Sequence, residues 1–365
     1  MFFVEDADPR VLEGLHIAII GYGNQGNAQA NNLRDSGYAV TIGNRDDEYR
    51  ARAREDRFTV REIPDAVAEA DVVFVLIPDE EVPEVYRGRI RPFLKPKAAL
   101  VFASGYSIAS GGIEAPPDQD LLLIAPRMIG VGVRERFLSG EGFHCFIGIE
   151  RDASGQGFER LLALTRAIGG LRRGAVRITF RQEVTLDLFT EQAFGPAFGR
   201  VLISALEVLI EKGIPPEAAL VELYLSEELA HSMHKMAQVG LIKQLDLHST
   251  TSQYGALSRG IRFLRLGVKE KMLKIYEEIE SGAFFAEWKK LTSRLAFRAL
   301  KLFARRHPMA RVEQEVRRNL RIADPELHRP IAGPTPELHR PVAGPTPAPA
   351  GAETRASVPT ITHTH

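Results

Sequence analysis

The feature that most restricts the fold of this chain is a glycine-rich loop that directly follows a short apolar run. Residues 17–20 are Ile-Ala-Ile-Ile, and a polar stretch with the character of a helix follows over 24–35. A strand, a G-x-G-x-x-G turn and a helix form a phosphate-binding unit, because the turn lets the backbone and the helix N-terminus approach a pyrophosphate. The sequence therefore predicts a dinucleotide site made by Gly21, Tyr22, Gly23, Asn24, Gln25 and Gly26.

Short apolar, β-branched runs recur through the first half of the chain, separated by polar or amphipathic stretches. They lie at residues 17–20, 39–42, 72–77, 98–102, 121–125 and 146–149. This alternation is typical of strands and helices that build a parallel sheet buried on both faces. We predict an α/β, Rossmann-like, doubly wound domain over residues 1–180.

After residue 180 the strand pattern ends and apolar residues recur at helical spacing. The stretches with this spacing are 183–212, 216–237, 269–280 and 286–305. The sequence therefore predicts an all-helical domain over residues 181–322.

The last part of the chain changes composition to Pro, Gly, Ala, Thr and His. An eleven-residue unit occurs there twice in tandem, at 325–335 and 336–346. Because repeated prolines deny a segment a hydrogen-bonded core, we expect residues 323–365 to form a disordered tail.

Charge and cysteine content restrict the class of protein. The chain has 47 Lys and Arg against 47 Asp and Glu, which does not suggest a nucleic acid or an acidic membrane as partner and favours a small molecule. A single cysteine, Cys145, excludes an internal disulfide and fits a reducing compartment. We see no export signal and no membrane span, so we expect a cytoplasmic protein.

The loop after the second apolar run carries both charges that decide between dinucleotides. Arg45 suits the extra phosphate of NADPH, whereas an acid such as Asp46 suits the ribose hydroxyls of NADH. Asp47 and Glu48 add negative charge that would repel a phosphate. Both cofactors remain open, and the acids favour NADH.

Several further motifs, spread from residue 21 to residue 320, together resemble ketol-acid reductoisomerase. They lie at residues 21–29, 101–107, 125–126, 133–134, 152–155, 187–189, 191–192, 249, 251, 254–255 and 273–320. The resemblance implies that the helical domain is threaded as a knot and that a homodimer completes the active site. It also implies a reaction in which two magnesium ions hold a 2-aceto-2-hydroxy acid during an alkyl migration. NAD(P)H then reduces the resulting 2-oxo acid to a 2,3-dihydroxy acid, which is the second step in the biosynthesis of valine and isoleucine.

The resemblance also assigns candidate site residues. Asp187 and Glu191 lie four residues apart, on one face of a predicted helix, and match the first pair of metal-ligating carboxylates. Glu222 matches the first carboxylate of the second pair. Ser226 stands four residues on, where its partner is expected, and a different placement of the gap would bring Glu228 into that position. Ser249 matches a substrate-binding serine, and His248 beside it is a further candidate for binding substrate or transferring a proton.

Two departures from the family pattern affect the reacting centre. Ser104 stands in place of a histidine, and Arg127 stands in place of a lysine. We count both as catalytic candidates, together with Asp187 and Glu191. Arginine holds its proton and is a poor substitute for a proton-transferring lysine. Weakened metal binding also harms alkyl migration more than hydride transfer.

Three hypotheses follow for the function. The first is an NAD(P)H-dependent reductase of a 2-oxo or acetohydroxy acid, or of a related C=N substrate, with isomerisation in doubt. The second is a magnesium-dependent ketol-acid reductoisomerase. The third is a non-catalytic dinucleotide sensor.

Overall fold

Eight strands form one sheet in the computed structural model, which describes residues 1–322. The strands are β1 (Ile17–Ile20), β2 (Val40–Gly43), β3 (Thr59–Arg61), β4 (Val72–Val75), β5 (Ala99–Phe102), β6 (Asp120–Pro126), β7 (Cys145–Arg151) and β8 (Ala175–Arg177). Their order is β3-β2-β1-β4-β5-β6-β7-β8, and only β6 and β7 pair antiparallel. The first six strands have the Rossmann order, in which ligands bind beyond the carboxyl ends of the strands beside β1.

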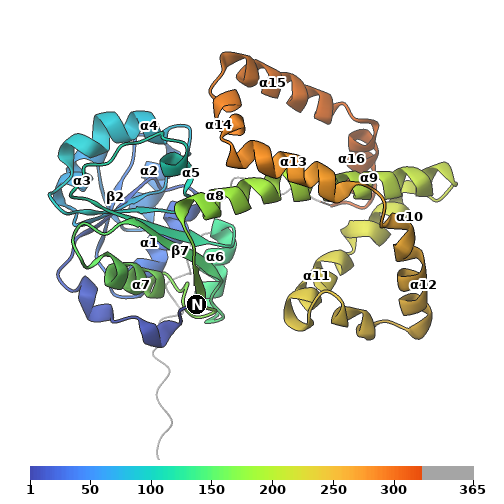
Figure 1. Cartoon of the computed structure of the whole chain (residues 1–365), viewed down its shortest axis with the longest axis horizontal. Helices are drawn as coiled ribbons and strands as arrows, with labels where there is room; N and C mark the ends of the chain where they lie inside the picture. The colour runs from blue at the N-terminus through green and yellow to red at the C-terminus, as the bar shows by residue number, and fades with distance from the viewer. Residues whose placement is uncertain (323–365) are drawn as a thin grey trace, which may run out of the picture. The chain divides into compact units, whose positions relative to one another are not determined.

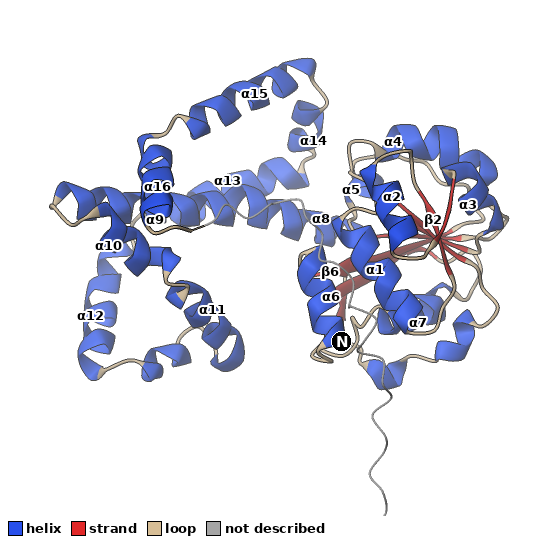
Figure 2. Cartoon of the chain, turned by 180° about the vertical axis from the view of Figure 1, so that it is seen from behind, coloured by secondary structure: helices blue, strands red, loops and turns tan. Residues whose placement is uncertain are grey.

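Helices cover both faces of this sheet (Figure 2). One face packs against α1 (Asn24–Asp35), α2 (Glu48–Glu55), α6 (Gly130–Leu138) and α7 (Gly157–Ala167). The other face packs against α3 (Ile63–Glu69), α4 (Val82–Val85) and residue Phe180. A sheet buried on both sides explains the nearly continuous apolar runs of the sequence. The predicted Rossmann-like domain is confirmed.

The six predicted strands all exist, with bounds shifted by at most two residues. The pattern missed β3 and β8, which have three residues each and are too short to give a periodic signal. It also missed that β7 runs against β6, with a register irregularity at Leu121/Leu122.

The second half of the described chain is helical, as predicted (Figure 1). Its helices are α8 (Phe180–Phe189), α9 (Gly195–Glu211), α10 (Pro216–Leu220), α11 (Glu228–Val239), α12 (Thr250–Gly260), α13 (Val268–Glu280), α14 (Ala283–Trp288), α15 (Leu291–Arg305) and α16 (Pro308–Asn319). A short helix, α5 (Tyr106–Ala109), follows β5 in the first half. The knot and the division at residue 180 stay predictions, and the predicted tail lies outside the described residues.

Two of the predicted helices are interrupted. The helix expected over 216–237 breaks at Glu227, whose φ of 63° is left-handed and cannot continue a helix. The helix expected over 286–305 is divided between α14 and α15. The helix expected over 183–212 is instead continuous, because a π-helical turn, Thr190–Phe194, joins α8 to α9.

This continuous helix, Phe180–Glu211, is the one helix within residues 1–322 that is long and apolar enough to cross a membrane. That differs from our expectation that the sequence holds no such stretch. Length and composition are weak grounds for a membrane span, and the helix carries Glu183, Asp187 and Glu191 in its first part. In the single chain, only 11% of the most apolar 18-residue stretch of this helix is buried. Most of its apolar surface is therefore exposed.

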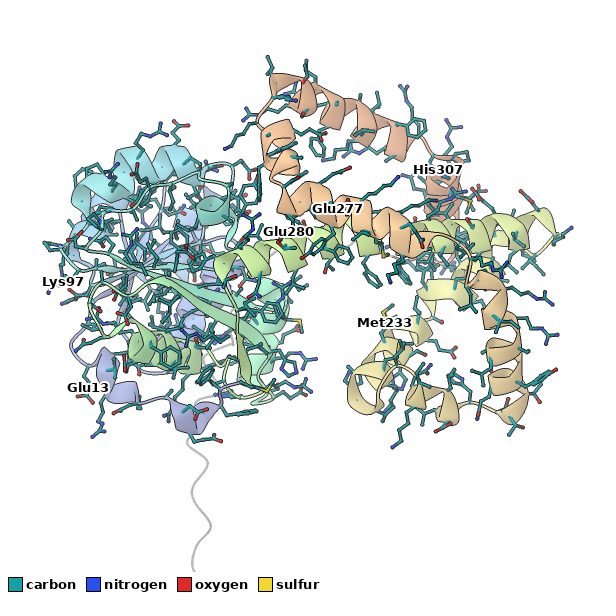
Figure 3. The ribbon with its side chains drawn as sticks, viewed as in Figure 1. Glu13, Lys97, Met233, Glu277, Glu280 and His307 are labelled. Carbon is teal, nitrogen blue, oxygen red and sulfur yellow. The ribbon has the colours of Figure 1, made fainter. Side chains whose placement is uncertain are left out.

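Glu280 on α13 holds α8 in place (Figure 3). Thr185 Oγ1 donates a hydrogen bond to Glu280 Oε1 at 2.5 Å. The guanidinium of Arg181 lies 3.5 Å from the other carboxylate oxygen. These contacts fix the helix that carries the acidic residues of the predicted site.

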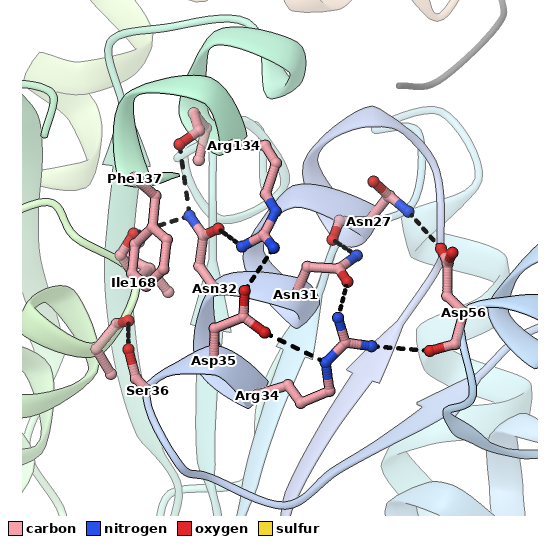
Figure 4. A network of polar contacts seen from close by, with 12 residues as sticks. Asn27, Asn31, Asn32, Arg34, Asp35, Ser36, Asp56, Arg134, Phe137 and Ile168 are labelled. Atoms are coloured by element: carbon pink, nitrogen blue, oxygen red, sulfur yellow. Dashed lines mark hydrogen bonds and ion pairs between the residues drawn. The ribbon is translucent and has the colours of Figure 1, made fainter. Parts of the chain in front are cut away.

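The helix behind the glycine loop, α1, is held by buried polar contacts on both sides (Figure 4). Arg134 of α6 donates to Asn32 Oδ1 at 2.9 Å and pairs with Asp35 at 2.5 Å. On the other side, Arg34 donates to the main-chain oxygen of Asp56, which follows α2. Because buried polar groups are costly unless paired, this network specifies where α1 sits and where the loop at its start points.

Candidate active site

The three glycines of the loop have separate structural roles. Gly21 has a φ of 97°, and a Cβ there would lie 2.6 Å from Leu76 O. A Cβ on Gly26 would lie 2.1 Å from Gly21 O, whereas a Cβ on Gly23 would meet nothing within 4 Å. The outer glycines are therefore required by packing. The middle glycine faces open space at the start of α1, as the approach of a pyrophosphate requires.

The ring of Tyr22 is buried and points away from this open space. It packs edge-on against Phe58, with ring centroids 5.7 Å apart. Its hydroxyl donates to Asp56 Oδ2 at 2.7 Å. Tyr22 thus ties the glycine loop to the end of α2.

A cavity of about 500 Å³ extends from the glycine loop across the carboxyl ends of the central strands. Its lining includes the predicted residues Gly21, Tyr22, Gly23, Asn24, Gln25 and Arg45, together with Asn44, Asp47, Ala103, Ser104 and Ser107. Gly26 packs behind the loop, and Asp46 is exposed outside the lining, so that Asp47 is the acid at the cavity. We call this cavity the dinucleotide cavity.

The guanidinium of Arg45, at one end of the dinucleotide cavity, is paired with two carboxylates of the chain. Arg45 donates to Asp47 Oδ2 and to Glu81 Oε2, each at 2.9 Å. These partners, first of all the hydrogen bond to Asp47, raise the pKa of Arg45. Asp47 also accepts from the Arg50 main-chain nitrogen as the N-cap of α2. A ribose 2′-phosphate would have to compete with two carboxylates for Arg45, which favours NADH.

An unpaired polar atom marks the other end of the dinucleotide cavity. Ser107 is 2% exposed, and among the described residues its hydroxyl has no hydrogen-bond partner. Buried hydroxyls are normally paired, so a ligand that offers a polar group beside Ser107 would satisfy it. With the open space at Gly23, this orphaned hydroxyl fits a bound dinucleotide.

A second, smaller cavity of about 220 Å³ lies beside the first. Its lining is acidic and aromatic: Asp79, Glu80, Ser104, Tyr106, Val184, Asp187, Leu188, Glu191, Phe284 and Trp288. We call it the acidic cavity. Asp79 and Ser104 line both cavities, so the two spaces meet at these residues.

The acidic cavity brings together the predicted pair Asp187 and Glu191. The π-helical turn Thr190–Phe194 begins between them, and such turns are frequent at functional sites. Burial, followed by repulsion from Asp187, raises the pKa of Glu191. Burial also raises the pKa of Asp79 to about 6, with further contributions from Glu80, Asp187 and Glu191.

The guanidinium of Arg127 bridges two carboxylates at the edge of this site. It donates to Glu183 Oε1 at 3.1 Å and to Asp187 Oδ1 at 2.8 Å. Glu183 is buried, and its other oxygen accepts from the Gly105 main-chain nitrogen at 2.8 Å. Burial raises the pKa of Glu183 to about 7. Arg127 therefore lies beside the predicted metal ligand.

Our prediction from the sequence overlooked Glu183 and Asp79. Glu183 precedes Asp187 by four residues, so the helical spacing 183, 187, 191 could have revealed it. Asp79 closely follows β4, and the carboxyl ends of parallel strands are the usual ligand side of such sheets.

Three predicted site residues do not lie at either cavity within the described chain. Glu222, His248 and Ser249 are exposed and line neither cavity. Ser249 caps α12 instead, accepting from the Ser252 main-chain nitrogen at 3.3 Å. The 17 residues of α9 separate Glu191 from Glu222, a helical rise of roughly 25 Å. Accordingly, residues 1–322 contain no group of three His, Cys, Asp or Glu side chains suited to a metal.

Two family models match the chain. Residues 11–174 match the NADPH-binding domain of acetohydroxy acid isomeroreductase, and residues 180–321 match the C-terminal domain of ketol-acid reductoisomerase.

Curated relatives match over most of the length. The ketol-acid reductoisomerase (NADP(+)) of Methanopyrus kandleri is 39% identical over 326 residues, which are 88% of this chain and 98% of that protein. The enzyme of the same name from Pyrobaculum islandicum is 39% identical over 320 residues, 87% of this chain and 96% of that protein. A solved NADH-preferring ketol-acid reductoisomerase from an uncultured archean is 33% identical with a TM-score of 0.81, covering 87% of this chain and 98% of that one.

Proposed function

Because this chain belongs to the ketol-acid reductoisomerase family and is an NAD(P)H-dependent oxidoreductase, we propose that it reduces a 2-oxo or acetohydroxy acid, or a related C=N compound, with the isomerisation step weakened. Its substrate is a small molecule. We further propose that it works in the cytoplasm. The observation that carries the proposal is the meeting of the dinucleotide cavity and the acidic cavity at Asp79 and Ser104.

Each part of the site has a task in this reduction. The bound dinucleotide supplies a hydride. The glycine loop orients it from one side, and Ser107 offers an unpaired hydroxyl on the other. The acidic cavity receives the substrate, and the aromatic side chains of Phe284 and Trp288 restrict water there. Hydride transfer requires this close approach of donor and acceptor more than it requires metal ligands.

The isomerisation step is disfavoured by three substitutions relative to the family pattern. Arg127 holds its proton and is engaged with Glu183 and Asp187. Ser104 lacks the ring of the expected histidine, and Ser226 lacks the expected carboxylate. Alkyl migration depends on strong stabilisation of oxyanion charge, so it suffers most from these losses.

A test of the proposal is the oxidation of NADH and NADPH by the purified full chain with a panel of 2-oxo acids, 3-hydroxy-2-oxo acids and cyclic imines. Turnover of at least one class supports it. Absence of oxidation across the panel, in protein that binds NADH, would instead favour a non-catalytic dinucleotide sensor.

A complete, magnesium-dependent reductoisomerase is the second candidate. Its support is the overall identity to the named relatives and the placement of Asp187 and Glu191 in one cavity. Turnover of 2-acetolactate that requires magnesium would establish this candidate.

We also propose that two copies form the working enzyme. Large apolar side chains stand exposed on the helical part, including Val201 (62%), Leu257 (60%) and Phe303 (73%). Such surfaces call for a partner, and a second copy could bring Glu222, His248 and Ser249 to the site. Sedimentation of the full chain as a dimer supports this arrangement, and a stable monomer argues against it.

A further inference from the structure

Arg127 lies directly beside Asp187, to which the family resemblance assigns a divalent cation. Its two terminal nitrogens donate to Glu183 Oε1 and Asp187 Oδ1. The planar fork of a guanidinium matches two carboxylates at once, which the compact ammonium of a lysine cannot do in the same fixed geometry. One oxygen of Asp187 is therefore paired with a cation that the chain itself supplies.

The position of Arg127 is fixed from several sides. Its main-chain nitrogen donates to His144 O at 2.9 Å, where β6 meets the start of β7. Its guanidinium lies over the ring of Phe146, 4.9 Å from the centroid. Its partner Glu183 has a side chain that is 1% exposed and is anchored by Gly105. Moving Arg127 away would leave Glu183 buried without its cationic partner, which is strongly unfavourable.

The remaining residues do not fit the two-magnesium site of the family. Ser226 offers no carboxylate where the pattern expects one, so a second copy that brought Glu222 to the site would supply only one carboxylate of that pair. Although four carboxylates line the acidic cavity, no three His, Cys, Asp or Glu side chains of the described chain are placed so that they could hold one metal ion. Arg127 already engages Asp187 Oδ1, so a metal ion at Asp187 would have to share this carboxylate with the guanidinium or displace it.

We propose that Arg127 is the built-in cation of this site and that reduction here proceeds without a divalent metal. This inference rests on the reductase function proposed above. The carbonyl carbon accepts a hydride from NAD(P)H, the carbonyl electron pair moves to the oxygen, the oxygen takes a proton from water, and NAD(P)⁺ is released. By pairing with Asp187, Arg127 lowers the negative charge that would oppose the developing charge on that oxygen.

The first experiment measures metal binding without any turnover. Metal-free full-length protein is titrated with Mn²⁺, and unbound Mn²⁺ is followed by its paramagnetic resonance signal. We expect wild-type protein to bind Mn²⁺ no more tightly than Asp187→Asn. Arg127→Gln frees Asp187 and should raise the affinity by roughly 10- to 100-fold, the range seen when groups beside metal ligands change.

Arg136→Gln is the matched control, because Arg136 pairs with Glu141 away from both cavities and its variant should behave as wild type. Wild-type binding that is much tighter than that of Asp187→Asn overturns the proposal, as does an Arg127→Gln variant with no gain. If Arg127→Gln does not fold, the comparison of Mn²⁺ affinity between wild type and Asp187→Asn still tests whether Asp187 binds a metal ion.

The second experiment measures NAD(P)H oxidation with 3-hydroxy-3-methyl-2-oxobutanoate in EDTA and in excess MgCl₂. We expect the same rate in both. A rate that disappears in EDTA and returns with Mg²⁺ overturns the proposal. Absence of oxidation in both conditions refutes the reductase function itself, and the Mn²⁺ titration then still tests the role of Arg127.

Discussion

Replacing Gly23 with alanine should separate cofactor binding from folding. Gly23 has a φ of −71° and a ψ of −158°, at the edge of the extended region that alanine adopts, and its added Cβ meets nothing within 4 Å. We therefore expect the free energy of unfolding to change by no more than about 0.5 kcal/mol. The new methyl group enters the space that a pyrophosphate approaches, so the dissociation constant for NADH should rise at least about tenfold, or ~1.4 kcal/mol.

Gly26→Ala is the matched variant with the opposite profile. Its Cβ would lie 2.1 Å from Gly21 O, so the loop and α1 must move apart. Overpacking of this kind costs about 1–3 kcal/mol, and each kcal/mol lowers the melting temperature by roughly 1–2 °C in a chain of 365 residues.

The assays are thermal unfolding of the free proteins and titration with NADH followed by protein fluorescence. The reasoning is refuted if Gly23→Ala binds NADH as wild type does. It is equally refuted if Gly23→Ala melts as early as Gly26→Ala.

Three further predictions concern single side chains. Ser107→Ala removes an unpaired buried hydroxyl, so the free energy of unfolding without cofactor should rise by about 1 kcal/mol while NADH binds more weakly; unchanged NADH affinity would remove Ser107 from the cofactor site. Glu81→Gln releases one partner of Arg45 and should improve NADPH binding relative to NADH by about two- to fivefold, the value of an exposed ion pair; competition between the two cofactors measures this, and a shift toward NADH contradicts it. Asp79 has its pKa raised from 3.8 to about 6, so the folded protein keeps a proton that the unfolded chain loses, and stability should fall as pH rises through that window. Asp79→Asn should flatten this decline in melting temperature measured in EDTA, and an unaltered profile would show that Asp79 is not its source.

The sequence alone was sufficient for the parts of the structure that depend on local pattern. The bounds of β1 and α1 follow from an apolar run, a glycine turn and a polar helix, which are all contiguous. The family resemblance assigned Asp187 and Glu191, and helical spacing places both on one face. The roles of Gly21 and Gly26 were also predictable, because only glycine tolerates such close approaches.

Other features depend on contacts between distant segments and could not be predicted in this way. The bridge from Arg127 to Glu183 joins the end of β6 to α8, 56 residues later. The pairing of Arg45 with Glu81 joins two loops across the sheet, so the sequence left the choice of cofactor open. The break at Glu227 interrupts a stretch whose apolar spacing is continuous, because one residue adopts a left-handed conformation.

The most direct test of the account compares two substrates with one preparation of the full chain in excess MgCl₂. NAD(P)H oxidation is measured with 3-hydroxy-3-methyl-2-oxobutanoate, which needs only reduction, and with 2-acetolactate, which must first rearrange. Because Arg127 is paired with Asp187, and Ser104 and Ser226 replace the expected histidine and carboxylate, we expect turnover of 3-hydroxy-3-methyl-2-oxobutanoate and little or none of 2-acetolactate. Equal turnover of both substrates would contradict the claim that this site keeps hydride transfer and has weakened isomerisation.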